Sequence, residues 1–116
     1  MIVIYHNPQC STSRKVLDLI RQNGFEPEVI DYREAGWTRG QLLGLFAAAD
    51  LTPAQALRTK NTDAEDRGLI GAEAAKILDA MVENPLLVER PLVAGPGGVR
   101  LCRPAEAALD VLKRRG

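Results

Sequence analysis

The sequence lacks several features that would place it in a specialised class. It has only two cysteines, too few for a disulfide scaffold, so we expect reduced thiols and a cytoplasmic protein. No apolar run approaches the ~20 residues that cross a bilayer, and the N-terminus has no basic signal-peptide region. Fifteen basic residues balance fifteen acidic ones, which leaves no net charge for attracting nucleic acid or an anionic membrane. We therefore expect neither as a partner.

What remains is an ordinary globular composition, with 46% hydrophobic and 26% charged residues. Aromatic residues make up only 4%, so the core must be mostly aliphatic. A chain of 116 residues suits a single domain, and we expect one over residues 1–116.

The first third predicts a βαβ unit. The apolar run Ile2–Tyr5 indicates a strand buried on both faces, and the hydroxyls of Ser11–Ser13 are suited to cap a helix. Asn23-Gly24 ends that helix, and Glu28–Tyr32 forms a second strand. Strand, helix and strand within about 30 residues favour a right-handed crossover.

The middle of the chain is predicted to be helical. Thr38 with Gln41 and Thr52 with Gln55 have capping-box spacing, and the apolar pattern over 72–83 indicates another helix. The polar stretch 59–68 between them is expected to be exposed.

The last third returns to strands. Leu86–Val88 leads into a strand over 90–93, the turn at 96–98 returns the chain along 99–102, and a final helix begins at Pro104. The whole order predicts an α/β fold of the thioredoxin-like type, a mixed four-stranded sheet (βαβ plus ββα) with an inserted helical segment. Within it, Pro91 is either an edge residue or preceded by a cis bond.

Cys10 is the main candidate for chemistry. It follows the first strand and precedes the first helix, and its neighbours in sequence are polar. The N–H groups and dipole of a helix N-terminus favour a thiolate and also attract an oxyanion. The alternative is a buried structural cysteine. The pattern is Cys-x-x-Ser, so Cys10 cannot form a disulfide one turn along the helix, and an external thiol must complete any redox cycle.

Two other residues have two interpretations each. His6, the only histidine, either holds Cys10 as a thiolate through its imidazolium or is an ordinary capping or surface residue. Cys102 lies among apolar residues in a predicted strand, which favours a small core filler over a second catalytic thiol.

Arg58, Arg90 and Arg103 each follow a structural signal, and each alone is interpreted as a surface charge. Arginine nevertheless suits tetrahedral oxyanions, because its planar fork makes paired charge-assisted hydrogen bonds. In a thioredoxin-like fold the Arg90-Pro91 junction would lie beside Cys10, which favours Arg90 among the three.

A set of short motifs runs in order along nearly the whole chain. They are Tyr5-His6-Asn7-Pro8-x-Cys10-x-Thr12-Ser13-Arg14, Leu57-Arg58-Thr59-Lys60, Gly68-Leu69, Asn84-Pro85, Glu89-Arg90-Pro91-Leu92-Val93 and Arg100-Leu101-Cys102-Arg103-Pro104. In these motifs the chain resembles the glutaredoxin-linked arsenate reductases.

The resemblance implies reduction of arsenate to arsenite by a monomeric oxidoreductase. Cys10 would attack arsenic, His6 would lower the pKa of Cys10, and Ser13 would hydrogen-bond the thiolate. Arg58, Arg90 and Arg103 would bind the oxyanion. Glutathione and glutaredoxin would supply the electrons, with no bound cofactor and no metal.

A regulatory function is the alternative. Relatives of similar length include thiol-handling proteins without arsenate activity and the Spx-type regulators that bind RNA polymerase. Those regulators usually carry Cys-x-x-Cys as a redox switch, so Ser13 in place of a second cysteine argues against a switch in this chain.

Overall fold

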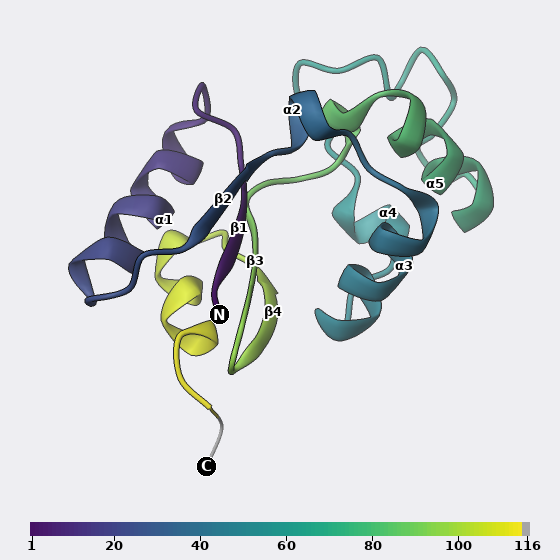
Figure 1. Ribbon diagram of the computed structural model, residues 1–116. Coiled ribbons are helices and arrows are strands. Elements are labelled where there is room, and N and C mark those ends of the chain that lie inside the picture. Colours follow the sequence, from purple (N-terminus) through teal and green to yellow (C-terminus); the bar gives the residue numbers. More distant parts are fainter. Residues whose placement is uncertain (115–116) are drawn as a thin grey trace. The chain divides into compact units, whose positions relative to one another are not determined.

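The structure, a computed structural model, describes residues 1–114 (Figure 1). The chain divides into two compact units, the first made of residues 1–35 together with the chain from Arg90 onward, the second of Gly36–Glu89. That residues 1–116 form one domain stays a prediction.

The first unit is built on a mixed four-stranded sheet in the order β2-β1-β3-β4. β1 (Val3–His6) is parallel to β2 (Glu28–Asp31) and antiparallel to β3 (Leu92–Gly95), and β3 is antiparallel to β4 (Gly98–Leu101). β1 is therefore a central strand with a neighbour on each side. The loop that follows β1 leaves the sheet between the ends of these neighbours. This is the βαβ plus ββα order that the sequence predicts.

Helices cover the sheet of the first unit. Helix α1 (Ser11–Gln22) and the 3-10 helix η2 (Ala105–Val111, in yellow) pack together, and Figure 1 shows both on the same side of the strands. Burial of their apolar side chains against the sheet provides the main stabilising free energy of this unit. The buried core consists of Ile2, Ile4, Val16, Ile20, Val93, Cys102, Ala105, Ala108, Val111 and Leu112.

The β3–β4 hairpin turn packs closely on the end of the chain. The N–H of Gly97 donates to the carbonyl oxygen of Val111 at 3.0 Å. A Cβ at Gly97 would lie 2.1 Å from the carbonyl oxygen of Asp110, a distance that no side chain tolerates. Glycine at this position allows the hairpin to approach η2.

Several expectations at the N-terminal end need correction. The Ser11–Ser13 hydroxyls do not cap α1, because Cys10 itself occupies the N-cap position and makes no capping hydrogen bond through its side chain. The first strand is not buried on both faces: Val3 and Tyr5 are half-buried, since α1 and η2 cover one side. The second strand ends at Asp31, and Tyr32 begins the short helix α2 (Tyr32–Ala35).

Two 3-10 helices occur in the last third of the described chain. The first includes part of the segment Leu86–Val88 that leads into the third strand. Pro85–Leu87 forms the 3-10 helix η1, where the side chain of Asn84 accepts a hydrogen bond from the Leu86 N–H at 3.2 Å. The final helix does start after Pro104, but it is a 3-10 helix.

The second unit is helical. It contains α3 (Arg39–Ala48), α4 (Pro53–Ala56), α5 (Ala74–Glu83) and η1. Both predicted capping boxes are present, Thr38 with Gln41 and Thr52 with Gln55, so that local hydrogen bonds define where α3 and α4 begin. The stretch 59–68 is largely exposed, as predicted, except for the buried Ala64 and the partly covered residues near it.

The apolar faces of these helices form the interior of the second unit. Leu42, Leu45 and Phe46 of α3 are buried, as are Ile77, Leu78, Ala80 and Met81 of α5. The indole N–H of Trp37 donates to the carbonyl oxygen of Pro85 at 3.3 Å, and Leu57 bridges to Val88.

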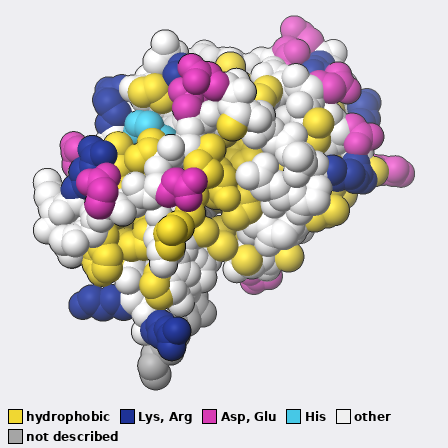
Figure 2. Space-filling model, in the orientation of Figure 1, with side chains coloured by type: hydrophobic (Ala, Val, Ile, Leu, Met, Phe, Trp, Pro, Cys, Tyr) yellow, Lys and Arg dark blue, Asp and Glu magenta, His cyan; other side chains and the backbone are white. Residues whose placement is uncertain are grey.

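Both arginine–proline bonds in the first unit are cis: Arg90-Pro91 and Arg103-Pro104. None of the helices among residues 1–114 has both the length and the apolarity to cross a bilayer. Basic and acidic side chains are interspersed over the face drawn in Figure 2, as the balanced composition suggests.

Candidate active site

The loop between β1 and α1 holds Cys10 in a defined position. The N–H of Cys10 donates to the carbonyl oxygen of Asn7 at 2.9 Å, and the Asn7 side-chain oxygen accepts from the Gln9 N–H at 3.0 Å. The Asn7 side-chain amide donates to the hydroxyl of Tyr32 at 3.2 Å. Arg14 donates to the carbonyl oxygen of Pro8 at 2.8 Å. The loop is thus tied to both α1 and the end of β2.

Cys10 ionises more easily than an ordinary cysteine. Burial opposes ionisation, but the Ser13 backbone N–H, the Arg90 side chain, the Ser13 hydroxyl and the Thr12 backbone N–H outweigh it and lower the pKa of Cys10 to about 7. These donors surround the sulfur at the N-terminus of α1, where backbone N–H groups have no partner within the helix. A large fraction of the thiol is therefore ionised at neutral pH.

Ser13 lies in the first turn of α1, within reach of this sulfur. Its side chain is fully buried, and its Oγ has no hydrogen-bond partner within the described part of the chain while Cys10 is a thiol. A buried hydroxyl without a partner costs roughly 1–3 kcal/mol. Its influence on the Cys10 pKa indicates that it is placed to donate to the thiolate when that anion forms.

Burial also acts on the ionisation of His6. Its side chain is 7% exposed, and its Nδ1 has no hydrogen-bond partner among residues 1–114. Burial lowers the pKa of His6, with Arg21, Arg33 and Arg14 acting in the same direction and Asp31 against it. This shift disfavours the imidazolium form, and the assignment of His6 to the catalytic site stays a prediction.

Arg90 and Arg103 belong to the same unit as Cys10. The Arg90 side chain acts on the Cys10 sulfur, as described above, and the Nε of Arg90 is buried without a partner among the described residues. Arg103 donates through Nη1 to the carbonyl oxygen of Arg90 at 3.0 Å. The segments preceding the two cis prolines are thereby joined beside the cysteine loop.

Arg58 lies in the second unit. It is buried at 8% exposure, its Nη1 forms an ion pair with Glu89 at 2.9 Å, and its backbone N–H donates to Leu87. Its Nε is buried and unpartnered among residues 1–114. Convergence of Arg58 with the other two arginines stays a prediction.

Cys102 is the core residue that the sequence predicts. It is 0% exposed and lies in the apolar core of the first unit. Burial raises the pKa of the Cys102 thiol to about 12, so this sulfur stays protonated at neutral pH.

A groove adjoins the cysteine loop. It has a volume of about 340 Å³ and is lined by Thr12, Lys15, Arg103, Pro104, Ala105 and Glu106. Among residues 1–114 no group of three or more His, Cys, Asp or Glu side chains is placed to hold a metal ion.

Sequence reasoning overlooked the residues that hold this site together. Asn7 and Tyr32 anchor the loop, and Lys15 faces the groove. Asn7-Pro8 is itself a turn signal, so the sequence could have indicated Asn7. The sequence could not have indicated its hydrogen bond to Tyr32, because the two residues are 25 positions apart.

Comparison with known proteins identifies the family of this chain. Residues 5–111 match the model of the ArsC family. The chain belongs to the ArsC family. It is 60% identical over 114 residues to the arsenate reductase ArsI2 of Synechocystis sp., covering 97% of this chain and 81% of the relative. It is 41% identical over 113 residues to the arsenate reductase of Escherichia coli K12, covering 96% and 80%.

Solved structures of the ArsC family confirm the thioredoxin-like fold. The arsenate reductase from Vibrio cholerae superposes with a TM-score of 0.89 at 35% identity, covering 96% of this chain and 97% of that one. The mixed sheet with its inserted helical segment is thus the family's architecture.

Proposed function

We propose that this chain is an arsenate reductase, in which Cys10 attacks arsenic and glutathione with glutaredoxin supplies the electrons. The observation that carries the proposal is a cysteine whose pKa of about 7 results from helix N–H groups and Arg90, in a chain of the ArsC family. The relatives named above are arsenate reductases.

The redox balance requires two thiols. The Cys10 thiolate forms a bond to arsenic as an arsenate oxygen leaves as hydroxide or water. Arsenic then gains two electrons in becoming arsenite, and two sulfurs each lose one and end joined as a disulfide. Cys102 cannot be the second sulfur, because it is buried and its pKa is raised to about 12. An external thiol such as glutathione must take that place, and a further thiol, that of glutaredoxin, must reduce the mixed disulfide.

Cations are needed because the nucleophile and the substrate are both anions. A thiolate approaching a charged oxyanion faces a Coulombic barrier unless nearby cations offset it. We assign this function to Arg90, Arg103 and Arg58; the first two are supported by their place in the unit of Cys10 and by the effect of Arg90 on the sulfur. Ser13 would stabilise the thiolate as a hydrogen-bond donor, and His6, whose pKa is lowered by burial, would stabilise it less than Arg90 does.

Turnover of arsenate by the purified chain with glutathione and glutaredoxin tests the proposal. Lysine substitution of Arg58, Arg90 or Arg103 keeps the charge but removes the planar fork, so each variant should stay folded and turn over arsenate at least about tenfold more slowly. Unchanged turnover in these variants would contradict the arginine assignment. Absence of arsenate turnover with any thiol donor, together with binding to RNA polymerase, would favour a regulatory protein instead.

We also propose that the protein is a cytoplasmic monomer, since its chemistry needs reduced thiols and a glutathione supply. Size-exclusion chromatography with light scattering measures the oligomeric state directly.

A further inference from the structure

The groove lined by Thr12, Lys15, Arg103, Pro104, Ala105 and Glu106 has unsatisfied charges. No ion pair involves Lys15, Arg103 or Glu106 within residues 1–114, and Lys15 and Arg103 are exposed. They project from two different segments, α1 and the residues after β4. Two cations and one carboxylate therefore line one concave surface with their charges available to a ligand.

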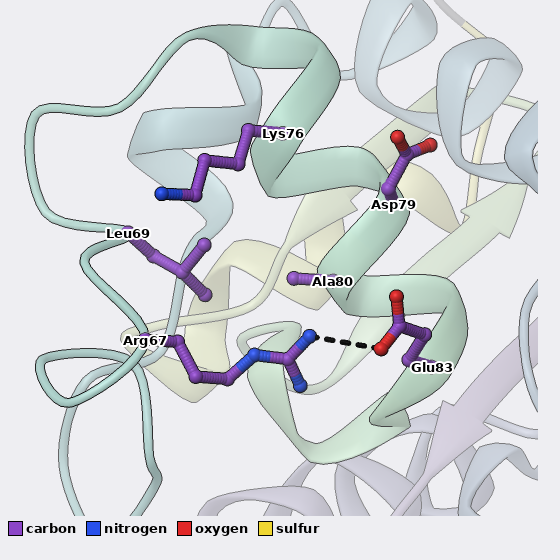
Figure 3. A pocket seen from close by; sticks show the side chains of 6 residues that line it. All are labelled: Arg67, Leu69, Lys76, Asp79, Ala80 and Glu83. Atoms are coloured by element: carbon purple, nitrogen blue, oxygen red, sulfur yellow. Dashed lines mark hydrogen bonds and ion pairs between the residues drawn. The ribbon is translucent and has the colours of Figure 1, made fainter.

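A second groove in the other unit provides the contrast. It measures about 580 Å³ and lies along α5, with Arg67, Leu69, Lys76, Asp79, Ala80 and Glu83 around it (Figure 3). Most of its charges are already neutralised: Arg67 is paired with Glu83 at 3.1 Å and Asp79 with Arg39. This groove is the larger of the two, which by itself would favour it as a ligand site. Most of its charged side chains are already paired, however, so a charged ligand would form fewer new ion pairs there.

The smaller groove also adjoins the immediate neighbours of the reactive sulfur. Thr12 lines the groove, and its backbone N–H is one of the donors acting on Cys10. Arg103 lines it as well and holds the carbonyl oxygen of Arg90 at 3.0 Å. Thr12 directly, and Arg103 through Arg90, thus connect the groove to groups that act on the Cys10 sulfur.

We propose that this groove binds the thiol co-substrate, and that it selects a zwitterionic thiol peptide that carries carboxylates. Lys15 binds a carboxylate of the peptide and Glu106 binds its ammonium group, while Arg103, assigned above to the oxyanion, borders the groove on the side of Arg90. The charges of one amino-acid head group match the charges that line the groove, whereas a simple anion would be repelled by Glu106 and a neutral thiol would gain nothing from it. This inference rests on the proposed function only in its choice of thiol as the ligand.

The step that the groove would assist is a thiol exchange at Cys10. Native protein treated with Ellman's reagent acquires a mixed disulfide between Cys10 and thionitrobenzoate, since Cys102 is fully buried. The glutathione thiolate then attacks the Cys10 sulfur, a glutathione–Cys10 disulfide forms, and thionitrobenzoate leaves with the electron pair of the broken bond. Its absorbance reports the rate without arsenate being present.

The test compares glutathione with its diethyl ester, which has the same thiol and ammonium but no carboxylate. Lys15→Glu should lower the second-order rate constant for glutathione by about tenfold and leave that for the ester within about twofold. Lys113→Glu, the same charge change at an exposed residue of the same unit that does not line the groove, should alter neither rate. Lys15→Gln should show a smaller loss in the same direction.

Equal losses for glutathione and the ester, no loss for glutathione, or the same loss in Lys113→Glu would each overturn the proposal. The exchange assay is separate from arsenate turnover. If Lys15→Glu slows glutathione but not its ester, and the unmodified protein reduces no arsenate, the groove assignment stands and the proposed function fails. If the unmodified protein reduces arsenate but Lys15→Glu does not separate the two thiols, the proposed function stands and the groove assignment fails.

Discussion

The two cysteines lie in differently organised regions of the same unit. Both are buried, Cys10 at 9% and Cys102 at 0% exposure, yet their pKa values move apart, to about 7 and about 12. Burial raises the pKa of both. The difference comes from donors: Cys10 lies at the N-terminus of a twelve-residue helix with Arg90 beside it, and Cys102 lies in an apolar core. Reactivity of a buried thiol is therefore decided by the groups that surround the anion and not by depth.

The largest expected effect of this contrast is on activity. Cys10→Ser should reduce arsenate turnover to background, because no other described sulfur is ionised near neutral pH. Cys102→Ser should keep most of the turnover but lose roughly 1–3 kcal/mol of stability, since it places a hydroxyl in an apolar core. Turnover and denaturant unfolding of both variants measure the two effects. Equal loss of turnover in the two folded variants would point to a cycle that uses both cysteines.

The contrast also predicts opposite pH dependences of stability. The folded-state pKa of Cys10 is below that of a free thiol, so its contribution is present above pH ~9 and is lost as the pH falls through about 7. The raised pKa of Cys102 has the opposite sign: its contribution is present below pH ~9 and is lost as the pH rises toward about 12.

Unfolding free energies of Cys10→Ser and Cys102→Ser between pH 6 and 10.5 separate these contributions. Relative to the unmodified chain, Cys10→Ser should lose the rise in stability between pH 7 and 9, and Cys102→Ser should lose the fall above pH 9. Alkylation by iodoacetamide gives an independent check, with a midpoint near pH 7 at Cys10 and no labelling of Cys102 in the folded protein. A midpoint near 8.5, the value of a free thiol, would contradict an activated Cys10.

Substitution of Arg90 measures how much of the lowered pKa of Cys10 is due to a residue far away in the sequence. Arg90→Ala should raise the pKa of Cys10 by roughly 1 pH unit or more, because a cation beside a thiolate favours the charged form. Arg90→Lys should raise it less, since the charge is kept. Arg100→Ala, which removes an arginine paired with Asp110 at 3.0 Å, is the control and should leave the Cys10 midpoint unchanged.

The smallest effect is expected at His6. Because burial lowers the pKa of His6 and so disfavours its cationic form, His6→Ala should shift the alkylation midpoint of Cys10 by less than Arg90→Ala does. A shift equal to that of Arg90→Ala would support the imidazolium interpretation. Comparison of the two variants at the same ionic strength decides between them.

Local patterns were sufficient for much of the fold. The apolar runs located four strands, the capping boxes at Thr38 and Thr52 located two helix starts, and Pro96-Gly97 located the hairpin turn. Each of these features involves residues within about four positions of each other. Hydrogen bonds and steric limits between sequence neighbours are therefore enough to determine where each one forms. The 3-10 helix at Pro85–Leu87 was not predicted, because a short apolar run suits a strand as well as a buried turn.

The chemistry of the site depended on contacts that no local pattern contains. Polar neighbours in the sequence singled out Cys10 as the candidate nucleophile, although the folded chain buries it almost as deeply as a core residue. Its low pKa needs Arg90, 80 positions later in the chain, and its loop needs the hydroxyl of Tyr32. The lowered pKa of His6 likewise follows from burial. Ionisation depends on desolvation and on charges nearby in space, and only the packing of the sheet and helices sets these.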